Sequence, residues 1–283
     1  MLMRQLTILL PIAGLLLSAP RVVRGQSWED TRTFPLPDDE SPLWLDLEAD
    51  VADVSVTGVE GIGAIEVALA IEGWSEDEID FVADYADAHL VVRVMVIAEE
   101  QNAFGGKRSI KLVLRVPVEL ELSMSVNVGS VAISGITVVN SLDVRTDVGA
   151  ITAQAALGEG DHTLQANVGD VHFDGSLEKG ALSMLSSVGD LAFTGQIGPD
   201  GALDLGAEVG AVTVTVAPGS AFRLEAQSNL GKVVDDLALH ERTTQSGLLD
   251  ALVQGVYGAA GQPQATVRAH TDVGEITITE AGR

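Results

Sequence analysis

The chain has 283 residues, a net charge of −25 and no cysteine. A charge of that sign and size repels nucleic acid and anionic lipid surfaces, and the lack of cysteine excludes disulfides and a lipid-modified N-terminal cysteine. Hydrophobic residues make up 46% of the chain but aromatic residues only 4%. We therefore expect a narrow interior filled by small aliphatic side chains.

The first 25 residues have the pattern of a secretory signal peptide. Arg4 provides a basic start, residues 6–17 are apolar, and the best cleavage site follows Gly25. The alternative is an uncleaved anchor, although the apolar run is shorter than the roughly 20 residues that span a membrane. Without this segment, 13 Lys and Arg face 41 Asp and Glu, a balance of −28. We expect export to the periplasm, the cell envelope or the outside, and no transmembrane segment in the mature chain.

A linker is expected at residues 26–42, followed by one repeat domain over residues 43–280. The domain begins with a degraded copy of the repeat described below, in which Ala52 takes the place of a glycine. Strand-like runs follow at residues 65–71, 89–98 and 109–116. We assign residues 43–119 to irregular N-terminal rungs.

One interruption of this strand pattern looks helical. Ser75 and Glu78 fit a capping box, and three apolar residues follow at helical spacing. We predict a short capping helix near residues 76–88 that covers the open N-terminal end of the stack, because bare end strands invite association. The acidic residues of this stretch could attract calcium, but a solvated helix face is the simpler interpretation.

A short motif then recurs through the rest of the chain: a small polar residue, Val or Leu, Gly, a variable residue and an aliphatic residue. Successive motif glycines are 20, 20, 20, 21, 21 and 43 residues apart. A fixed period of this size in a strand-rich sequence is typical of stacked coils of one repeating unit. The motif glycines are Gly129, Gly149, Gly169, Gly189, Gly210, Gly231 and Gly274.

Side chains alternate around each glycine. With the glycine counted as position zero, positions −7, −5 and −1 are mostly aliphatic, the even positions between are mostly hydrophilic, and aliphatic residues return at +2 and +4. Strict alternation predicts a strand with one buried face. The positions that face inward are odd-numbered before the glycine and even-numbered after it. Such a change needs a bend with an extra residue, so we interpret the seven glycines as structural corners. Position −2 should form a polar column with alternating neutral and acidic members.

These observations predict an all-β fold, a single-stranded parallel β-solenoid (β-helix) with rungs of about 20 residues. Regular rungs are expected at residues 120–233 and 264–279, with an insertion at 234–263. Within the insertion, residues 246–257 could form a second short helix. A loop packed on the core is the plainer interpretation, with a partner-docking element and a strand as alternatives.

Several stretches match a known family. They are the strand at 110–116, the entry Val116-Pro117-x-x-Leu120-x-Leu122, and the Val-Gly-x-aliphatic series that ends at 273–278. In these features the chain resembles the putative-adhesin, or toast-rack, family of exported bacterial β-strand-repeat proteins, over roughly residues 40–280. The resemblance implies a parallel β-solenoid at the cell envelope and carries over no catalytic motif. Some members accompany envelope-stress signalling proteins.

Catalytic and metal-binding patterns are missing from the sequence. The five histidines form no HExxH or similar ligand pair, and no phosphate loop or nucleophile elbow is present. His162 stands where other rungs have an aliphatic residue, and with Asp161, His172 and Asp174 it suggests a triad or metal site only weakly. A buried, locally hydrogen-bonded histidine is the simpler interpretation. We expect no catalytic, cofactor-binding or metal residues.

The sequence thus favours a non-enzymatic exported solenoid that presents an extended face to an envelope protein or cell-surface component, as an adhesin, a scaffold or an accessory of stress signalling. We expect no nucleic-acid partner, and self-association stays open. Two alternatives remain. One is a carbohydrate-active β-helix enzyme, which would need acidic or basic groups that converge in a groove. The other is a protein whose assembly depends on divalent cations.

Overall fold

The computed structural model describes residues 27–36, 42–97, 108–247, 249–258 and 265–282. The expected signal peptide lies outside the described residues. The described part contains twenty strands and one short 3₁₀ turn, and it has no α-helix. The prediction of an all-β fold is therefore confirmed.

The strands fall into three groups along the chain. The N-terminal group comprises β1 (Ser27–Pro35), β2 (Leu43–Val51), β3 (Asp53–Val59), β4 (Ala64–Glu72), the 3₁₀ turn η1 (Glu76–Glu78), β5 (Ile79–Ala86), β6 (His89–Val96) and β7 (Ser109–Pro117). The central group comprises β8 (Glu119–Val128), β9 (Val131–Val148), β10 (Ile151–Leu157), β11 (Asp161–Val168), β12 (Val171–Val188), β13 (Leu191–Val209) and β14 (Val212–Val216). The C-terminal group comprises β15 (Phe222–Leu230), β16 (Val233–Asp235), β17 (His240–Ser246), β18 (Ala251–Tyr257), β19 (Ala265–Val273) and β20 (Ile276–Glu280).

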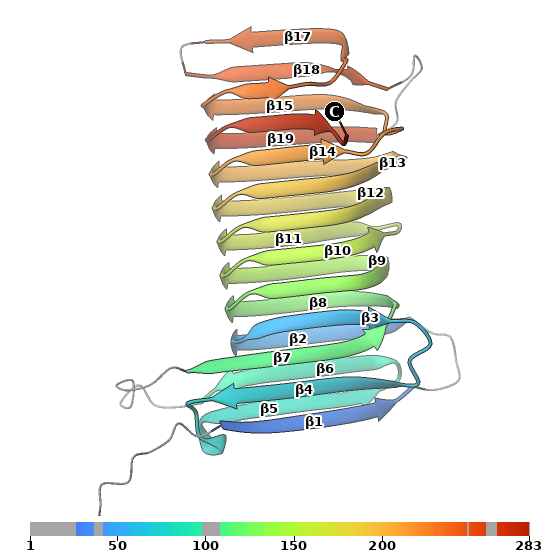
Figure 1. The fold of residues 1–283 in the computed structure, drawn as a ribbon, viewed down its shortest axis with the longest axis vertical. Coiled ribbons are helices and arrows are strands. Elements are labelled where there is room, and N and C mark those ends of the chain that lie inside the picture. Colours follow the sequence, from blue (N-terminus) through green and yellow to red (C-terminus); the bar gives the residue numbers. More distant parts are fainter. Residues whose placement is uncertain (1–26, 37–41, 98–107, 248, 259–264, 283) are drawn as a thin grey trace, which may run out of the picture.

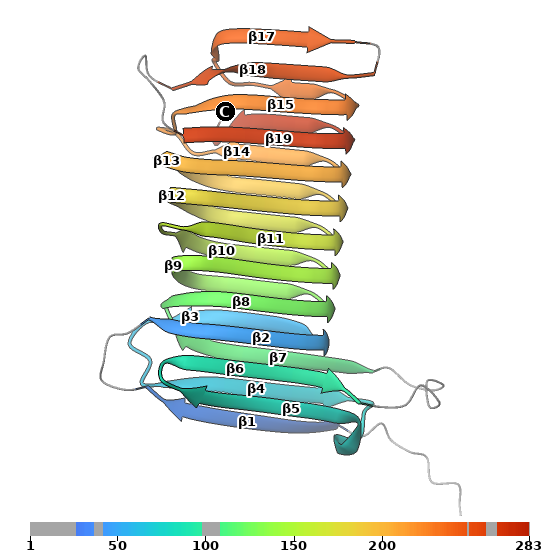
Figure 2. The ribbon, with the colours of Figure 1, turned by 180° about the vertical axis from the view of Figure 1, so that it is seen from behind.

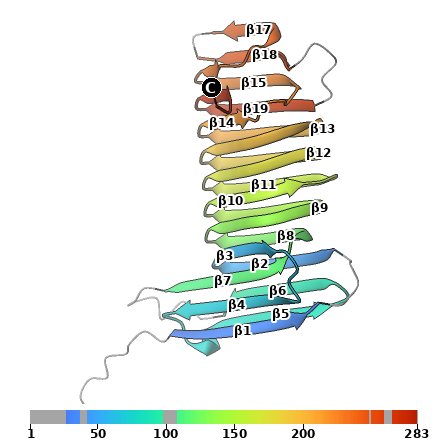
Figure 3. The same ribbon diagram turned by 45° about the vertical axis from the view of Figure 1, so that its right-hand side comes forward.

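The central strands wind back and forth between two sheet faces. The strand before each motif glycine lies on a first face, and the strand after it lies on a second face. Strands of successive rungs pair in parallel, so that Ile151 lies beside Val171 and His162 beside Leu182, each 20 residues on. Figures 1 and 3 show these rungs stacked from β8 to β13. The 20-residue repeat of the sequence is thus the register of the stack.

The C-terminal rungs do not stack in sequence order. On the first face β19 pairs with β13 on one side and with β15 on the other. On the second face β20 pairs with β14 and β16 in the same way. The last rung of the chain is therefore inserted between two rungs that are consecutive in the sequence, and the C-terminal end lies inside the stack (Figure 1).

The N-terminal end repeats this arrangement. On the first face β2 pairs with β6 and β8, and on the second face β3 pairs with β7 and β9, all in parallel. The Ala52 rung therefore lies between β6–β7 and β8–β9 (Figure 2), although it precedes both in the sequence. A stretch of the expected linker also has regular structure, because residues 27–35 form β1, which pairs antiparallel with β4.

Antiparallel strands close both ends of the stack. At the N-terminal end β4 pairs antiparallel with β7, and β5 with β6; at the C-terminal end β18 pairs antiparallel with β15, and β17 with β18. The predicted capping helix near residues 76–88 is wrong. The capping box exists, since the Ser75 N–H donates to Glu78 Oε2 at 2.7 Å, but it opens only η1, and residues 79–86 pair as a strand with β6. A helix at residues 246–257 is also wrong, because this stretch contains β18.

The core lies between the two faces. Its inward side chains are mostly Leu, Val, Ile and Ala, as the composition predicts. Two rungs place a larger side chain at position +4, and the Phe173 and Phe193 rings stack with centroids 5.6 Å apart. The core is continuous from the first N-terminal rung to the last C-terminal one.

Candidate functional site

The seven motif glycines form one line along the edge where the first face meets the second. Six of them have φ between 144° and 159°, and Gly231 is the exception. Each one also lies against the backbone of the neighbouring rung: a Cβ on Gly149 would be 1.9 Å from the carbonyl oxygen of Gly129, and a Cβ on Gly274 would be 2.0 Å from that of Gly210. Close approach between rungs, in addition to backbone angle, therefore requires glycine here.

A polar column runs beside these glycines at position −2. Asn167 Nδ2 donates to Asp147 Oδ1 at 2.8 Å, and Asn229 Nδ2 donates to Asp272 Oδ1 at 2.7 Å. At the N-terminal end Asn127 Nδ2 donates in the same way to Asp50 Oδ1, at 3.1 Å. In these three pairs an amide lies beside a carboxylate, as the alternation predicted, but the insertion of β19 breaks the alternation by placing Glu208 and Asp272 in neighbouring rungs.

Position −1 is exposed, which the alternating pattern did not predict. The aliphatic side chains at this position are between 37% and 50% exposed, although the pattern places them on the inward parity. The corner spans positions −2 to +1, so the residue before the glycine turns outward. We call these eight side chains the corner ridge; they are Val51, Val128, Val148, Val168, Val188, Val209, Leu230 and Val273.

Carboxylates border the corner ridge on both sides. Position −2 contributes Asp50, Asp147, Glu208 and Asp272, and position +1 contributes Asp53, Asp170, Asp190 and Glu275. Some of them also join the rungs: Asp170 Oδ1 accepts from the Asp190 N–H, and Asp190 Oδ1 from the Ala211 N–H, each at 2.8 Å. The one cation at these described positions is Lys232, which pairs with Glu275 at 3.0 Å. The ridge is therefore an apolar strip with an acidic rim.

The histidines of the weak triad hypothesis are not brought together. His162 faces the core and is 1% exposed, whereas His172 is exposed on the second face. His162 Nε2 lies 3.3 Å from the Gly158 carbonyl oxygen, and its Nδ1 is buried without a hydrogen-bond partner. Burial lowers the pKa of His162 below its ordinary value, against the opposing effects of Gly158 and Asp161. These contacts fit a buried, neutral histidine.

Acidic residues at 76–87 do not form a helix face. Glu78 accepts from the Ser75 backbone N–H and hydroxyl, and these hydrogen bonds lower its pKa. Within the described ranges, no group of three or more His, Cys, Asp or Glu side chains is arranged to hold a metal ion. In the same ranges no helix is long and apolar enough to cross a membrane.

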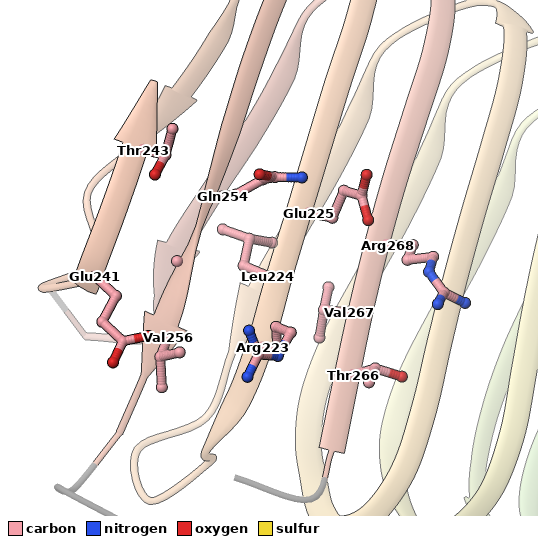
Figure 4. Close-up of a pocket in the computed structure, with 11 residues that line it drawn as sticks. Arg223, Leu224, Glu225, Glu241, Thr243, Gln254, Val256, Thr266, Val267 and Arg268 are labelled. Atoms are coloured by element: carbon pink, nitrogen blue, oxygen red, sulfur yellow. The ribbon is translucent and has the colours of Figure 1, made fainter. Parts of the chain in front are cut away.

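A depression of about 260 Å³ lies on the outer first face at the C-terminal end of the stack. Figure 4 shows its side chains on four adjacent strands, β17, β18, β15 and β19. Arg223 and Glu225 come from β15, Arg268 from β19, and Glu241 from β17. Glu241 lies at an irregularity of the β17–β18 pairing and has a φ of 51°, which is uncommon for a residue other than glycine. No sequence motif predicted this site, although Glu241, Gln254 and Val256 of its lining lie within the predicted insertion.

No family model matches the chain, and no curated protein matches it. Among solved structures, the chain is similar to a putative cell adhesion protein from Clostridium sporogenes, with 13% identity and a TM-score of 0.35, over 90% of this chain and 100% of that one. It is also similar to a putative adhesin from Bacteroides fragilis, with 13% identity and a TM-score of 0.32, over 89% and 97%.

A third similar structure is a putative lipid binding protein from Parabacteroides distasonis, with 11% identity and a TM-score of 0.33, over 89% of this chain and 96% of that one. The names of the first two neighbours, a putative cell adhesion protein and a putative adhesin, agree with the putative-adhesin family that the sequence resembles.

Proposed function

We propose that the protein is a non-enzymatic, exported β-solenoid whose corner ridge makes extended contact with a protein or another component of the cell surface. The observation that carries this proposal is the ridge itself. Eight aliphatic side chains from eight different rungs are exposed in one line, spaced about 4.8 Å apart by the strand separation. Stacking of the rungs does not need them, because each rung already buries the residues at −7, −5 and −3.

The acidic rim restricts the partner. Eight carboxylates line the ridge in a chain whose net charge is −25. A second copy of the same ridge would bring these carboxylates against their own kind, which is unfavourable. A partner with an apolar strip between Lys and Arg side chains would match both features. We therefore propose a basic envelope protein as the partner, with association that weakens as salt is added.

The test is capture by crosslinking from intact cells that carry a tagged mature protein. Val148, Val168 and Val188 are replaced together by Ser, and the matched control replaces the exposed Thr152 and His172 of the second face by Ser. We expect one defined envelope protein with wild type and control, and its loss with the ridge variant. Capture that survives in the ridge variant would remove the ridge from the interaction. Recovery of glycan alone would contradict a basic protein partner and indicate a saccharide partner instead.

A carbohydrate-active enzyme is the second candidate, because the depression of Figure 4 supplies the groove wall that the regular rungs lack. Glu225 and Glu241 place two carboxylates in its lining, and glycoside hydrolysis needs such a pair. The test is a panel of acidic and neutral polysaccharides with the wild-type protein. Turnover that is lost in both Glu225→Gln and Glu241→Gln would support the enzyme and contradict the first proposal.

A further inference from the structure

One aromatic side chain stands in solvent near the N-terminal end of the stack. Trp44 is 53% exposed and is the one aromatic residue among the exposed large hydrophobic side chains of the described residues. The next two outward residues of β2, Asp46 and Glu48, are charged. Indole surface left in water is unfavourable, and the rung does not need it for packing. The exposed part of the indole is therefore available to a ligand.

The neighbouring strands hold the Trp44 ring in place. β2 lies between β6 and β8 (Figure 2). The parallel registers put His89 of β6 beside Trp44 on one side and Glu121 of β8 on the other. The indole stacks on the His89 imidazole, with centroids 4.9 Å apart and planes 23° apart. Glu121 is fixed in turn by a hydrogen bond from the Asn140 amide. The ring is thus oriented before any ligand arrives.

A tight turn adds an acid to the same place. The β5–β6 hairpin turns at Asp87 and Ala88, whose φ values are 52° and 58°. A two-residue hairpin loop commonly needs left-handed backbone at both of its residues, which suits Asp better than Ala. The backbone N–H of Trp44 donates to the Ala88 carbonyl oxygen at 2.9 Å, which holds the turn beside β2.

These groups line one broad depression of about 920 Å³, together with Tyr85. Both charged side chains of its lining, Asp87 and Glu121, are acids. Carboxylates beside an aromatic face attract an organic cation, and tryptophan offers the strongest cation–π surface. The chain's net charge of −25 also attracts cations at long range and repels an anionic ligand.

We propose that this depression binds an alkylammonium group, with its apolar surface against the Trp44 indole and its charge shared between Asp87 and Glu121. The site lies on the outer first face and is independent of the corner ridge. An alkylammonium group occurs in free choline, in an amino sugar and in a lipid headgroup. The chemistry that recognises it is the same in each case.

The experiment titrates the full mature chain with choline chloride and with glucosamine, and follows protection of tryptophan fluorescence from acrylamide quenching. Vesicles of phosphatidylcholine, compared with phosphatidylglycerol, distinguish a headgroup from a free ligand. We expect saturable protection by at least one alkylammonium probe, and none by inositol, an uncharged polyol. Absence of saturable protection by choline, glucosamine and phosphatidylcholine vesicles would overturn the proposal, and so would equal protection by inositol.

Variants separate the site from general effects of charge. Isothermal titration of Trp44→Ala with the binding probe should show about a tenfold loss of affinity, and Trp44→Phe a smaller one. Glu121→Gln and Asp87→Asn should each weaken binding. Glu48→Gln is the matched control, because it removes the same charge from an exposed position of β2, the strand of Trp44, that lies outside the depression. An equal loss of affinity in Glu48→Gln would mean that binding depends only on the net charge, and it would contradict the proposed site.

Discussion

A Cβ placed on Gly169 would lie 2.0 Å from the carbonyl oxygen of Gly149, in the rung before it. The same contact recurs at every later motif glycine, since each corner rests on the backbone of its neighbour. The corner glycines therefore set the distance between rungs as well as the direction of the chain.

Gly169→Ala should lower the free energy of unfolding by about 2–4 kcal/mol, because it combines an unfavourable backbone angle with a clash against fixed backbone. Denaturant unfolding measures this. Gly63→Ala is the control: nothing lies within 4 Å of its added Cβ, and we expect a change below about 0.5 kcal/mol. Equal stability of Gly169→Ala and wild type would contradict the close approach of the rungs.

Removal of the last rung should disrupt the C-terminal half of the stack. Without residues 265–283, β13 and β15 lose the strand between them, and Leu203 and Leu224 lose their neighbour Val267. We expect loss of the single cooperative transition in thermal unfolding followed by circular dichroism. Removal of residues 282–283 alone should leave the transition unchanged. A cooperative transition at the wild-type temperature in the longer deletion would contradict the inserted position of β19.

Val168 and Val171 are three residues apart on opposite sides of a corner, at 48% and 0% exposure. Val168→Thr should change the free energy of unfolding by less than about 0.5 kcal/mol. Val171→Thr buries a hydroxyl in the apolar core and should cost about 1–3 kcal/mol. Similar losses in the two variants, measured by denaturant unfolding, would mean that position −1 is buried.

Asn167→Asp should destabilise the stack by about 0.5–1 kcal/mol at low salt, because it replaces the amide that donates to Asp147 with a second carboxylate. Added salt should relieve part of this loss, since the column is exposed to solvent. Melting temperatures at low and high salt provide the measurement. A loss that does not depend on salt would point to packing instead of charge.

His162 should make stability depend on pH. Its pKa is lowered in the folded protein, so its neutral form contributes stability that is complete above the ordinary pKa and is lost as pH falls through the folded pKa. His162→Leu matches the aliphatic residues at this position in the other rungs and should narrow the difference between melting temperatures at about pH 7.5 and about pH 5.5. His172→Gln is the exposed control. If the difference between the two melting temperatures is as large in His162→Leu as in wild type, other groups cause the pH dependence.

The sequence alone determined the parts of the fold that depend on local pattern. Alternation that includes positions −7 and −5 predicted strands with one buried face, and the motif glycines at regular spacing predicted the 20-residue register between Ile151 and Val171. The polar column followed for the same reason, because a fixed register places equivalent residues side by side.

The tertiary structure decided which rungs are neighbours and which side chains leave the core. Every rung has the same alternation, so nothing local tells β19 to pair between β13 and β15, or β2 between β6 and β8. The capping box at Ser75 was real, but pairing of β5 with β6 overrode the helical spacing that followed it. The corner geometry turned the side chain at position −1 outward, although the alternation predicted that it would face inward, and this created the corner ridge. The Trp44 depression joins residues from β2, the β5–β6 turn and β8, which only the stacking of the rungs brings together.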